Sequence, residues 1–365
     1  MAGAMTDGLE AQGVLDPAWR AAFTEVPRHV FVPMFYNHDG STVVRGHPEQ
    51  HEEWMAAVYR DESLTTQQVT MPGTGLVVPT SSSTRPSLMA RMLGLLDVAD
   101  GQSVLEIGTG TGYNAALLSH RLGAGRVASI DIDRTLVESA AAALKEVGFE
   151  PRLRTGDGAS GLPDLAPFDR VIATCAVPRV PVAWVDQLAD RGVIVTDIRA
   201  ETSTALATLT KVGPDTALGR FHAVPGHFMW LRAEASNPLR NGAFDFVFDV
   251  RGARESHTAL DPSILDDPNF GFALALHMPD ITGSYRRLDP DVRILRTADG
   301  SWAQVEVATH RTTQAGSRSV WDEVEGAARQ WSTLGRPQRS RFGLTVTSHS
   351  GQHIWLDHPD NRIPG

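Results

Sequence analysis

Apolar runs of strand length alternate with longer amphipathic stretches over the middle of this 365-residue chain. The strand-like runs lie at 104–107, 126–130, 152–154, 168–173 and 192–196, and the helix-like stretches lie at 114–122, 136–147 and 182–189. This alternation favours right-handed crossovers between parallel strands. The pattern therefore predicts an α/β fold with a doubly wound, Rossmann-like sheet, closed by a hairpin at 204–211 and 218–223.

The region before this sheet is less regular. Residues 14–32 predict a helix leading into a short extended segment at 26–33, which two prolines bracket. Residues 37–63 are polar and predict a surface loop or insertion without metal-ligand spacing. A helix is expected at 86–96, directly after four hydroxyl residues at 81–84. Helix capping or turn formation would explain only one or two of these four.

After about residue 232 the pattern changes to hairpins and one long helix. Residues 244–250 have strand character, and Asp299-Gly300 predicts a turn between strands at 292–296 and 302–307. An amphipathic helix is predicted at 320–334, followed by a hairpin at 342–346 and 353–356. We therefore predict two domains, 1–232 with the insertion at 37–63, and an α+β extension at 233–365. The tryptophans of the extension suit core positions.

Charge and cysteine content restrict the partners and the compartment. A formal net charge of −10, from 33 Lys and Arg against 43 Asp and Glu, argues against a general nucleic-acid binder. No apolar run approaches the roughly 20 residues of a membrane span. The single cysteine, Cys175, excludes an intramolecular disulfide and fits a reducing cytoplasm. We expect a cytoplasmic protein in which Cys175 is a small buried residue rather than a nucleophile.

A glycine loop follows the first strand of the predicted sheet. Gly108, Gly110 and Gly112 allow the backbone to turn sharply and approach a ligand, and Tyr113 and Asn114 then open a helix. Such loops serve dinucleotides, phosphates and S-adenosylmethionine alike. No Walker lysine follows Gly112, which argues against a nucleotide triphosphatase.

Carboxylates at the ends of two strands narrow the choice of ligand. Glu106 can accept a hydrogen bond from an amino-acid group, whereas it would repel a pyrophosphate. Asp131 ends the next strand and can bind both ribose hydroxyls, although it could equally cap a helix, and Asp133 competes for both roles. Asp157, between two glycines, suits an adenine edge or an ordinary turn.

This ordered set resembles the class I S-adenosylmethionine-dependent methyltransferases. Over residues 14–225 the chain looks more closely like the protein L-isoaspartate O-methyltransferases, through Val26–Pro33, Ser83–Pro86, Glu106–Ala116 and Phe168–Pro178. The resemblance implies S-adenosylmethionine as cofactor and S-adenosylhomocysteine as product. The expected cofactor-binding residues are Glu106, Gly108, Thr109, Gly110, Gly112, Tyr113, Asn114, Asp131, Ile132, Gly156, Asp157 and Gly158.

Two departures from the family pattern bear on the substrate. More than a hundred residues follow the predicted sheet, and Thr84 stands where the repair enzymes usually carry serine. This combination resembles the branch found with ribosomally made, modified peptides (graspetides, lanthipeptides and lasso peptides). The resemblance implies methylation of an aspartate in a precursor peptide, followed by closure of the ester to an aspartimide. Repair of L-isoaspartyl residues in damaged proteins is the alternative, and a cofactor-binding scaffold without turnover is a third.

Methyl transfer to a carboxylate sets modest chemical demands. The free carboxyl group has a pKa of about 3.9, so it is already ionised at neutral pH and needs no general base. The site must instead align the carboxylate oxygen with the methyl group and exclude water. Neutral hydroxyl donors suit this task, so Thr84, Ser83 and Ser82 are the candidate catalytic residues. The C-terminal extension is expected to recognise the peptide.

Overall fold

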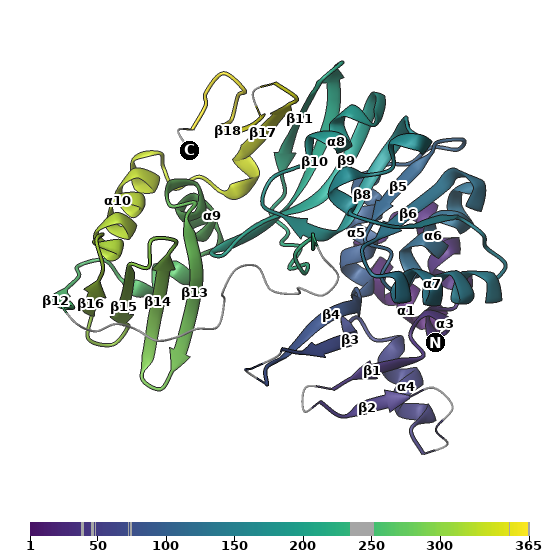
Figure 1. Ribbon diagram of the computed structural model, residues 1–365, viewed down its shortest axis with the longest axis horizontal. Helices are drawn as coiled ribbons and strands as arrows, with labels where there is room; N and C mark the ends of the chain where they lie inside the picture. The colour runs from purple at the N-terminus through teal and green to yellow at the C-terminus, as the bar shows by residue number, and fades with distance from the viewer. Residues whose placement is uncertain are drawn as a thin grey trace.

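The computed structural model describes residues 1–37, 40–44, 47, 49–71, 73, 75–233, 252–349 and 351–363. Its centre is a mixed sheet with the strand order β18-β17-β11-β10-β9-β8-β5-β6-β7 (Figure 1). The parallel strands are β5 (Val104–Ile107), β6 (Val127–Asp131), β7 (Arg152–Thr155), β8 (Phe168–Val177) and β9 (Leu188–Ala200). The antiparallel continuation is β10 (Ser203–Gly213), β11 (Thr216–Phe221), β17 (Phe342–Thr347) and β18 (Gly351–Leu356).

Both faces of this sheet are covered by apolar side chains. Val104 belongs to a cluster with α5 (Pro86–Leu96) and α6 (Tyr113–Leu122), whereas its neighbour Leu105 belongs to a second cluster with α8 (Val182–Asp186). Successive side chains of a strand point to opposite faces, so this division confirms the predicted doubly wound sheet. Helix α7 (Arg134–Glu146) packs beside β6 and β7. The helix predicted at 182–189 is shorter than expected, because β9 already begins at Leu188, which pairs with Phe168.

The N-terminal segment is more helical than predicted. It contains α1 (Ala2–Ala11), a 3₁₀ turn (Pro17–Trp19), α2 (Arg20–Glu25) and α3 (Arg28–Phe31). The extended segment predicted at 26–33 is therefore wrong over Arg28–Phe31. Pro27 takes the N-cap position of α3, and a helix tolerates proline at its start because no backbone N–H is needed there.

The loop predicted at 37–63 is also wrong, because most of it belongs to a small folded layer. Strands β1 (Met34–Tyr36), β2 (Thr42–Val44), β3 (Leu64–Thr70) and β4 (Val77–Ser83) form a sheet in the order β2-β1-β3-β4, with α4 (His51–Val58) beside it. The buried side chains of Trp54, Ala57 and Val58 lie at helical spacing. The indole of Trp54 donates to the Val32 carbonyl at 2.8 Å, which fixes this layer to the N-terminal helices.

The C-terminal region contains a second sheet with the order β12-β16-β15-β14-β13. Its elements are β12 (Arg254–His257), α9 (Pro268–His277), β13 (Ile281–Leu288), β14 (Asp291–Thr297), β15 (Trp302–Glu306), β16 (Arg311–Ala315) and α10 (Val320–Thr333). The hairpin around Asp299-Gly300 and the long helix are confirmed, and Trp302, Trp321 and Trp331 are buried as expected. The strand predicted at 244–250 lies outside the described residues.

The predicted C-terminal hairpin forms as β17 and β18, but it extends the central sheet rather than the second one. Leu344 of β17 pairs with Gly219 of β11. The ring of Phe272 in α9 packs at 4.8 Å from that of Phe221 and at 5.1 Å from that of Phe342. Residues before and after position 232 thus belong to one apolar core. The division into two domains at that position stays a prediction. We call the elements from β12 to α10, residues 254–333, the C-terminal unit.

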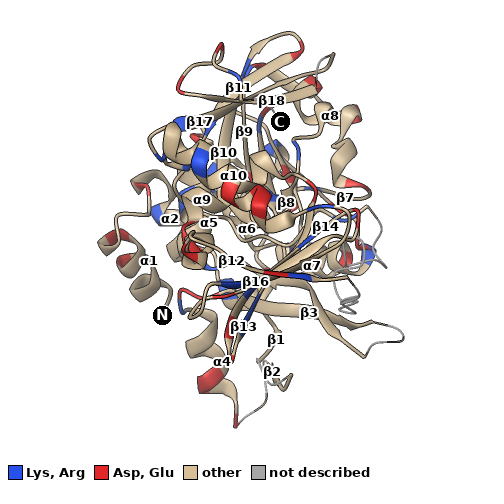
Figure 2. Ribbon diagram, turned by 90° about the vertical axis from the view of Figure 1, so that its left-hand side faces the viewer, with Lys and Arg blue, Asp and Glu red and all other residues tan. Residues whose placement is uncertain are grey.

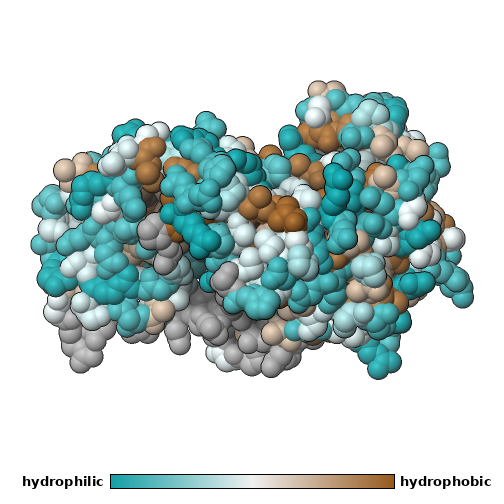
Figure 3. All heavy atoms as spheres, turned by 90° about the horizontal axis from the view of Figure 1, so that it is seen from above, coloured by the Kyte–Doolittle hydropathy of each residue, from teal (hydrophilic) through white to brown (hydrophobic). Residues whose placement is uncertain are grey.

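Charged and apolar residues are dispersed over the surface. Basic and acidic positions are interspersed on the side drawn in Figure 2, with acidic residues along α10. Seen from above, apolar side chains form small separate groups on this face (Figure 3). Among the described helices, none is long and apolar enough to cross a membrane.

Candidate functional site

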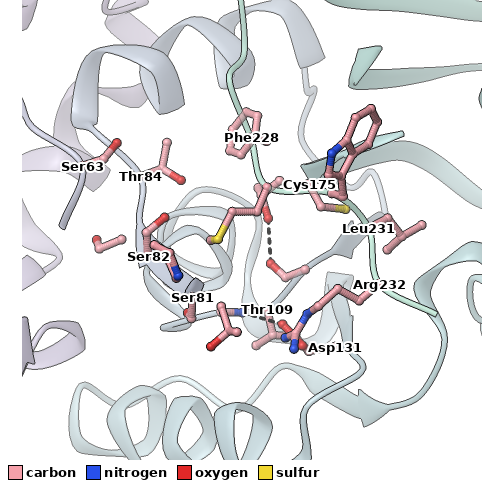
Figure 4. Close-up of a pocket in the computed structure, with 18 of the residues that line it drawn as sticks. Ser63, Ser81, Ser82, Thr84, Thr109, Asp131, Cys175, Phe228, Leu231 and Arg232 are labelled. Carbon is pink, nitrogen blue, oxygen red and sulfur yellow. Dashed lines mark hydrogen bonds between the residues drawn. The ribbon is translucent and has the colours of Figure 1, made fainter. Parts of the chain in front are cut away.

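A cavity of about 560 Å³ lies where the loops after β5 and β6 begin, the usual ligand position in such sheets. Three segments line it (Figure 4). The glycine loop at 108–114 and the end of β6 form one wall, β4 forms a second, and residues 226–232 cross the opening. Tyr285 of the C-terminal unit and Glu201 of the β9–β10 turn complete the outer part.

The glycine loop approaches its neighbours more closely than other residues would allow. Gly108 has a φ of +95°, and a Cβ there would lie 2.8 Å from Thr174 Oγ1. Gly112 has a φ of +85°, and a Cβ there would lie 2.9 Å from Ala140 Cβ in α7. Both positions combine left-handed backbone with a close contact, so the loop shape depends on glycine.

The carboxylate of Asp131 faces the glycine loop. Its two oxygens accept hydrogen bonds from the backbone N–H of Gly110 at 2.9 Å and of Asp133 at 3.0 Å. Asp133 instead caps α7, accepting from the N–H groups of Thr135 and Leu136. Of the two carboxylates that competed in the sequence, Asp133 therefore takes the helix-capping role, and Asp131 lines the cavity with acceptor capacity left for hydroxyl donors.

Glu106 is fully buried beneath the loop and anchors a chain of hydrogen bonds. It accepts from the Ser129 hydroxyl at 2.5 Å and from the Asn114 amide at 2.7 Å. Since Ser129 gives its hydrogen to Glu106, Thr109 is the donor in the 2.7 Å Thr109–Ser129 contact. Burial raises the pKa of Glu106 to about 7. The direct contact predicted between Glu106 and a ligand stays a prediction.

One buried acceptor in this wall lacks a partner. Asn114 Oδ1 has no hydrogen-bond partner among the described residues, although Asn114 lines the cavity. A ligand ammonium group would supply the missing donor. Asp131 offers acceptors for hydroxyl groups, and Ile130, Ile132 and Leu136 offer an apolar surface for a flat ring. These chemistries match the amino-acid, ribose and adenine parts of S-adenosylmethionine, so the site fits this cofactor.

The remaining predicted cofactor residues differ in position. Gly158 lines the cavity, whereas Gly156 and Asp157 are not among the described lining residues. Asp157 accepts from the N–H of Ala159 at 2.9 Å, which is the turn role left open from the sequence. Tyr113 lines the cavity and packs its ring against Phe31 at 5.8 Å. The adenine contact of Asp157 stays a prediction.

Ser81 to Ser83 of the hydroxyl run lie on strand β4, which the sequence pattern did not predict, and Thr84 directly follows the strand. Capping does not explain this run, because the N–H of Ser87 in the first turn of α5 donates to the Asp61 carboxylate at 2.7 Å rather than to a hydroxyl of the run. The hydroxyl oxygen of Ser83 accepts from Arg28 at 3.3 Å, and that of Ser81 accepts from Thr66 at 3.2 Å. The hydroxyls of Ser82 and Thr84 have no hydrogen-bond partner among the described residues, and both residues line the cavity, as labelled in Figure 4.

Arg28 holds this segment in place. Its guanidinium is fully buried, which lowers its pKa, and its hydrogen bonds to the described residues all go to oxygen atoms. The carbonyl groups that accept from it belong to Val58, Arg60, Glu62, Ser83 and Thr84. In the sequence Arg28 stands out only as part of the motif Val26–Pro33, although a charged residue within the apolar segment 26–32 was a signal for a buried polar role.

The outer wall comes from residues that are far apart in the sequence. Arg199 donates to the Phe228 carbonyl at 2.6 Å, and its guanidinium lies 4.9 Å from the ring centre of Trp230. Buried Asp197 accepts from the Phe228 N–H at 3.2 Å and from the Thr204 hydroxyl at 2.6 Å. The segment 226–232 is thus held from below by β9 and β10. No local pattern in the sequence links these residues to the glycine loop.

Cys175 lines the cavity but is buried, and burial raises the pKa of its thiol well above the ordinary value. This environment agrees with the prediction of a small buried residue. Within the described part of the chain, no group of three or more His, Cys, Asp or Glu side chains could hold a metal ion.

The raised pKa of Glu106 leads to a prediction about stability. A carboxyl group whose pKa is higher in the folded state stabilises the fold below its ordinary pKa and loses that contribution as pH rises through about 7. Relative to Glu106→Gln, the cofactor-free protein should lose up to about 3 kcal/mol between pH 4.5 and pH 8. Urea unfolding of both proteins across this range measures the difference. Equal pH slopes would contradict the assignment.

Comparison with known proteins adds to this geometry. The family model for protein-L-isoaspartate(D-aspartate) O-methyltransferases matches residues 41–222. A protein-L-isoaspartate O-methyltransferase from Roseiflexus castenholzii is 33% identical over 211 residues, covering 58% of this chain and 83% of that protein. A relative described as protein-L-isoaspartate O-methyltransferase 1, from an Anaeromyxobacter species, is 37% identical over 198 residues, covering 54% and 79%.

A solved structure described as a protein-L-isoaspartate O-methyltransferase has the same overall fold. It aligns with 98% of this chain and 100% of its own, with a TM-score of 0.58 at 23% identity. The extension therefore also occurs in a protein of that description, and it does not by itself mark a peptide-modifying branch. Taken with the glycine loop and the cavity, the relatives show that this chain belongs to the protein-L-isoaspartate O-methyltransferase family and is an S-adenosylmethionine-dependent carboxyl O-methyltransferase.

Proposed function

We propose that this protein methylates the free carboxylate of L-isoaspartyl residues in proteins. The observation that carries the proposal is the pair of hydroxyls on Ser82 and Thr84, which lack partners among the described residues and line the cavity that contains the glycine loop. The names of the relatives support the same substrate. S-adenosylmethionine would supply the methyl group, and the protein would bring a carboxylate oxygen to it.

The surrounding residues suit this task. Ser82 and Thr84 donate hydrogen bonds that orient a carboxylate without neutralising it. No general base is required, because a carboxyl group with a pKa of about 3.9 is ionised at neutral pH. The apolar side chains of Met89, Phe228 and Leu231 also line the cavity and limit the access of water.

A double substitution tests the two hydroxyls. Each hydrogen bond to a charged group contributes about 1.5–3 kcal/mol, so Ser82→Ala with Thr84→Val should lower kcat/KM by at least about 100-fold. Cofactor affinity should stay within about threefold, since Asp131 and Asn114 are untouched. Ser81→Ala is the matched control on the same strand, because that hydroxyl already accepts from Thr66. A double variant with wild-type kcat/KM would rule out this role.

A second candidate function concerns the same site. Thr84 occupies the position that is usually serine in the repair enzymes, and Tyr285 of the C-terminal unit lines the cavity. The threonine in place of serine favours an acceptor that differs from a repair substrate. The reaction would then be methylation of an ordinary aspartate in a ribosomally made precursor peptide, with closure of the ester to an aspartimide by attack of the following backbone nitrogen and release of methanol.

Paired peptides separate the two functions. Each pair has one sequence and carries either aspartate or isoaspartate at a single position, and methyl ester formation is followed by mass spectrometry. We expect methylation of the isoaspartyl member of each generic pair. Methylation confined to the aspartyl member, above all in a peptide encoded beside this protein, would reverse the assignment. Binding of the cofactor without transfer to either member would favour a scaffold without turnover.

A further inference from the structure

We propose that this protein also catalyses the step that follows methylation, closure of the methyl ester to a cyclic imide, and that His227 is the general base of that step. The inference rests on the proposed carboxyl methylation and adds a second reaction at the same site. It applies to either acceptor, because the methyl esters of an aspartyl and of an isoaspartyl residue close to the same five-membered ring.

Ring closure makes a demand that methyl transfer does not. The backbone nitrogen of the following residue attacks the ester carbonyl carbon, so a C–N bond forms and the C–O bond to the methoxy group breaks. The nitrogen must lose its proton, and the departing methoxide must gain one to leave as methanol. A positioned base that takes up this proton and passes it to the methoxide typically accelerates such a step by about 10²–10⁴-fold.

His227 offers a free base to the cavity. Among the described residues that line the cavity, it is the only histidine. Its imidazole has no hydrogen-bond or ion-pair partner within the described part of the chain. The carboxylates of Glu106 and Asp131 also line the cavity, but both are engaged by hydrogen bonds within the cofactor wall. The imidazole of His227 is therefore the base left for a peptide nitrogen.

The backbone of His227 is fixed in an unusual conformation. Its φ is +54°, in the left-handed region that few residues other than glycine adopt. The His227 N–H donates to the Thr204 hydroxyl at 3.1 Å, and this hydroxyl donates to Asp197 at 2.6 Å. The N–H of Phe228 donates to the other Asp197 oxygen at 3.2 Å. Strained residues that are held in this way cluster at functional sites.

The groups around His227 keep its imidazole in the basic form. Partial burial and the positive charges of three arginines lower the pKa of His227, whereas the Asp197 carboxylate of β9 raises it. The arginines are Arg199 of β9, Arg85 before α5 and Arg339 before β17. Because the lowering effects prevail, the imidazole is neutral at pH 7 and has a nitrogen lone pair that can accept a proton.

Ser82 and Thr84 would serve ring closure as well as methyl transfer. When the backbone nitrogen attacks, negative charge develops on the ester carbonyl oxygen, and hydroxyl donors beside that oxygen stabilise it. Arg85, whose charge acts on the His227 imidazole, directly follows Thr84 in the chain. Phe228, the residue after His227, lines the same cavity as Thr84 (Figure 4). The base and the hydroxyls can thus act on one ester.

A preformed ester isolates the second step. Short peptides that carry the methyl ester of isoaspartate or of aspartate are mixed with the protein and saturating S-adenosylhomocysteine, the complex that methyl transfer leaves behind. Imide and methanol are followed by chromatography and mass spectrometry, and at pH 7 we expect closure at least about 100-fold faster than in buffer. Closure no faster than in buffer would overturn the inference and leave the proposed methylation standing. Rapid closure by a protein that methylates neither free peptide would overturn the proposed methylation instead.

His227→Asn tests the residue itself, because asparagine also tolerates the left-handed backbone but has no basic side chain. Its closure rate should fall to within about threefold of the rate in buffer. With S-adenosylmethionine and the free peptide, the methyl ester should accumulate in place of the imide. His222→Asn is the matched control, since His222 contacts the Thr208 hydroxyl at 2.8 Å and lies outside the described cavity lining. Wild-type closure by folded His227→Asn would show that His227 is not the base.

The pH profile separates a base from a structural role. A histidine base works only when it is neutral, and the pKa of His227 lies below its ordinary value of about 6.5. The catalysed closure rate should therefore rise with pH up to about 6.5 and then level off. Closure in buffer depends on hydroxide, so its rate should keep rising by about tenfold per pH unit. A catalysed rate that runs parallel to the rate in buffer, without a plateau, would contradict the histidine base.

Discussion

Replacing Asp131 with alanine is expected to weaken binding of S-adenosylhomocysteine by at least about 100-fold, because two hydroxyl hydrogen bonds to a carboxylate contribute about 1.5–3 kcal/mol each. The same substitution releases the Gly110 N–H from its acceptor. The loop would then lose one of its anchors as well as its ligand contact. Isothermal titration calorimetry with the purified product measures the change directly.

Asp133→Ala is the matched control for this experiment. Asp133 lies two residues away and carries the same charge, but it caps α7. Losing a helix cap costs about 0.5–2 kcal/mol of stability, and cofactor affinity should stay within about threefold. If Asp133→Ala weakened binding as much as Asp131→Ala, the roles assigned to the two carboxylates would be wrong.

Arg28→Met should give the largest loss of stability. The substitution removes the donor shared by several buried or half-buried carbonyl groups, and each acceptor left without a partner costs about 1–3 kcal/mol. We expect a loss of more than about 3 kcal/mol in the free energy of unfolding, measured by urea denaturation. Methylation should fall as well, since the same guanidinium fixes the backbone of Ser83 and Thr84.

Arg85→Met provides the comparison for Arg28. Its side chain is exposed at the start of α5, so removal of its charge should change stability by less than about 0.5 kcal/mol. Comparing the two variants separates the loss of the buried hydrogen bonds of Arg28 from the loss of one positive charge. Equal effects of the two substitutions would show that Arg28 is dispensable for the segment that precedes α5.

The central sheet was predictable because its signal is local and repeated. Strands such as 104–107 are short, apolar apart from Glu106, and separated by amphipathic helices, so periodicity alone assigns them. The layer at 37–63 was missed because β2 is three residues long and α4 eight, which is too short for a clear period. The strand β4 was missed because its hydroxyl residues and Pro79 resemble a turn.

Some residues of the candidate site could also be located from the sequence, whereas others are brought together only by the fold. The glycine loop, Asp131 and the hydroxyl run could be located from sequence because each lies within one short segment. The unpaired oxygen of Asn114 could not be located in this way. Its position depends on hydrogen bonds that bring Asn114, Glu106 and Ser129 together from different elements. Tyr285 reaches the cavity because the C-terminal unit packs on the central sheet, as α9 does on β10, and no pattern near residue 285 indicates that contact.

The pairing of β11 with β17 has a consequence for how this enzyme could be altered. The chain leaves the central sheet after β11, builds the C-terminal unit, and returns to the neighbouring strand, with Arg220 opposite Gly343 (Figure 1). The unit is therefore a looped-out module whose two ends meet at one place, not a tail. Cutting the chain after residue 232 would remove β17 and leave the edge of β11 without a paired strand. Exchanging the module between β11 and β17 would keep the strand order, and it offers a route to transplant substrate preference between relatives.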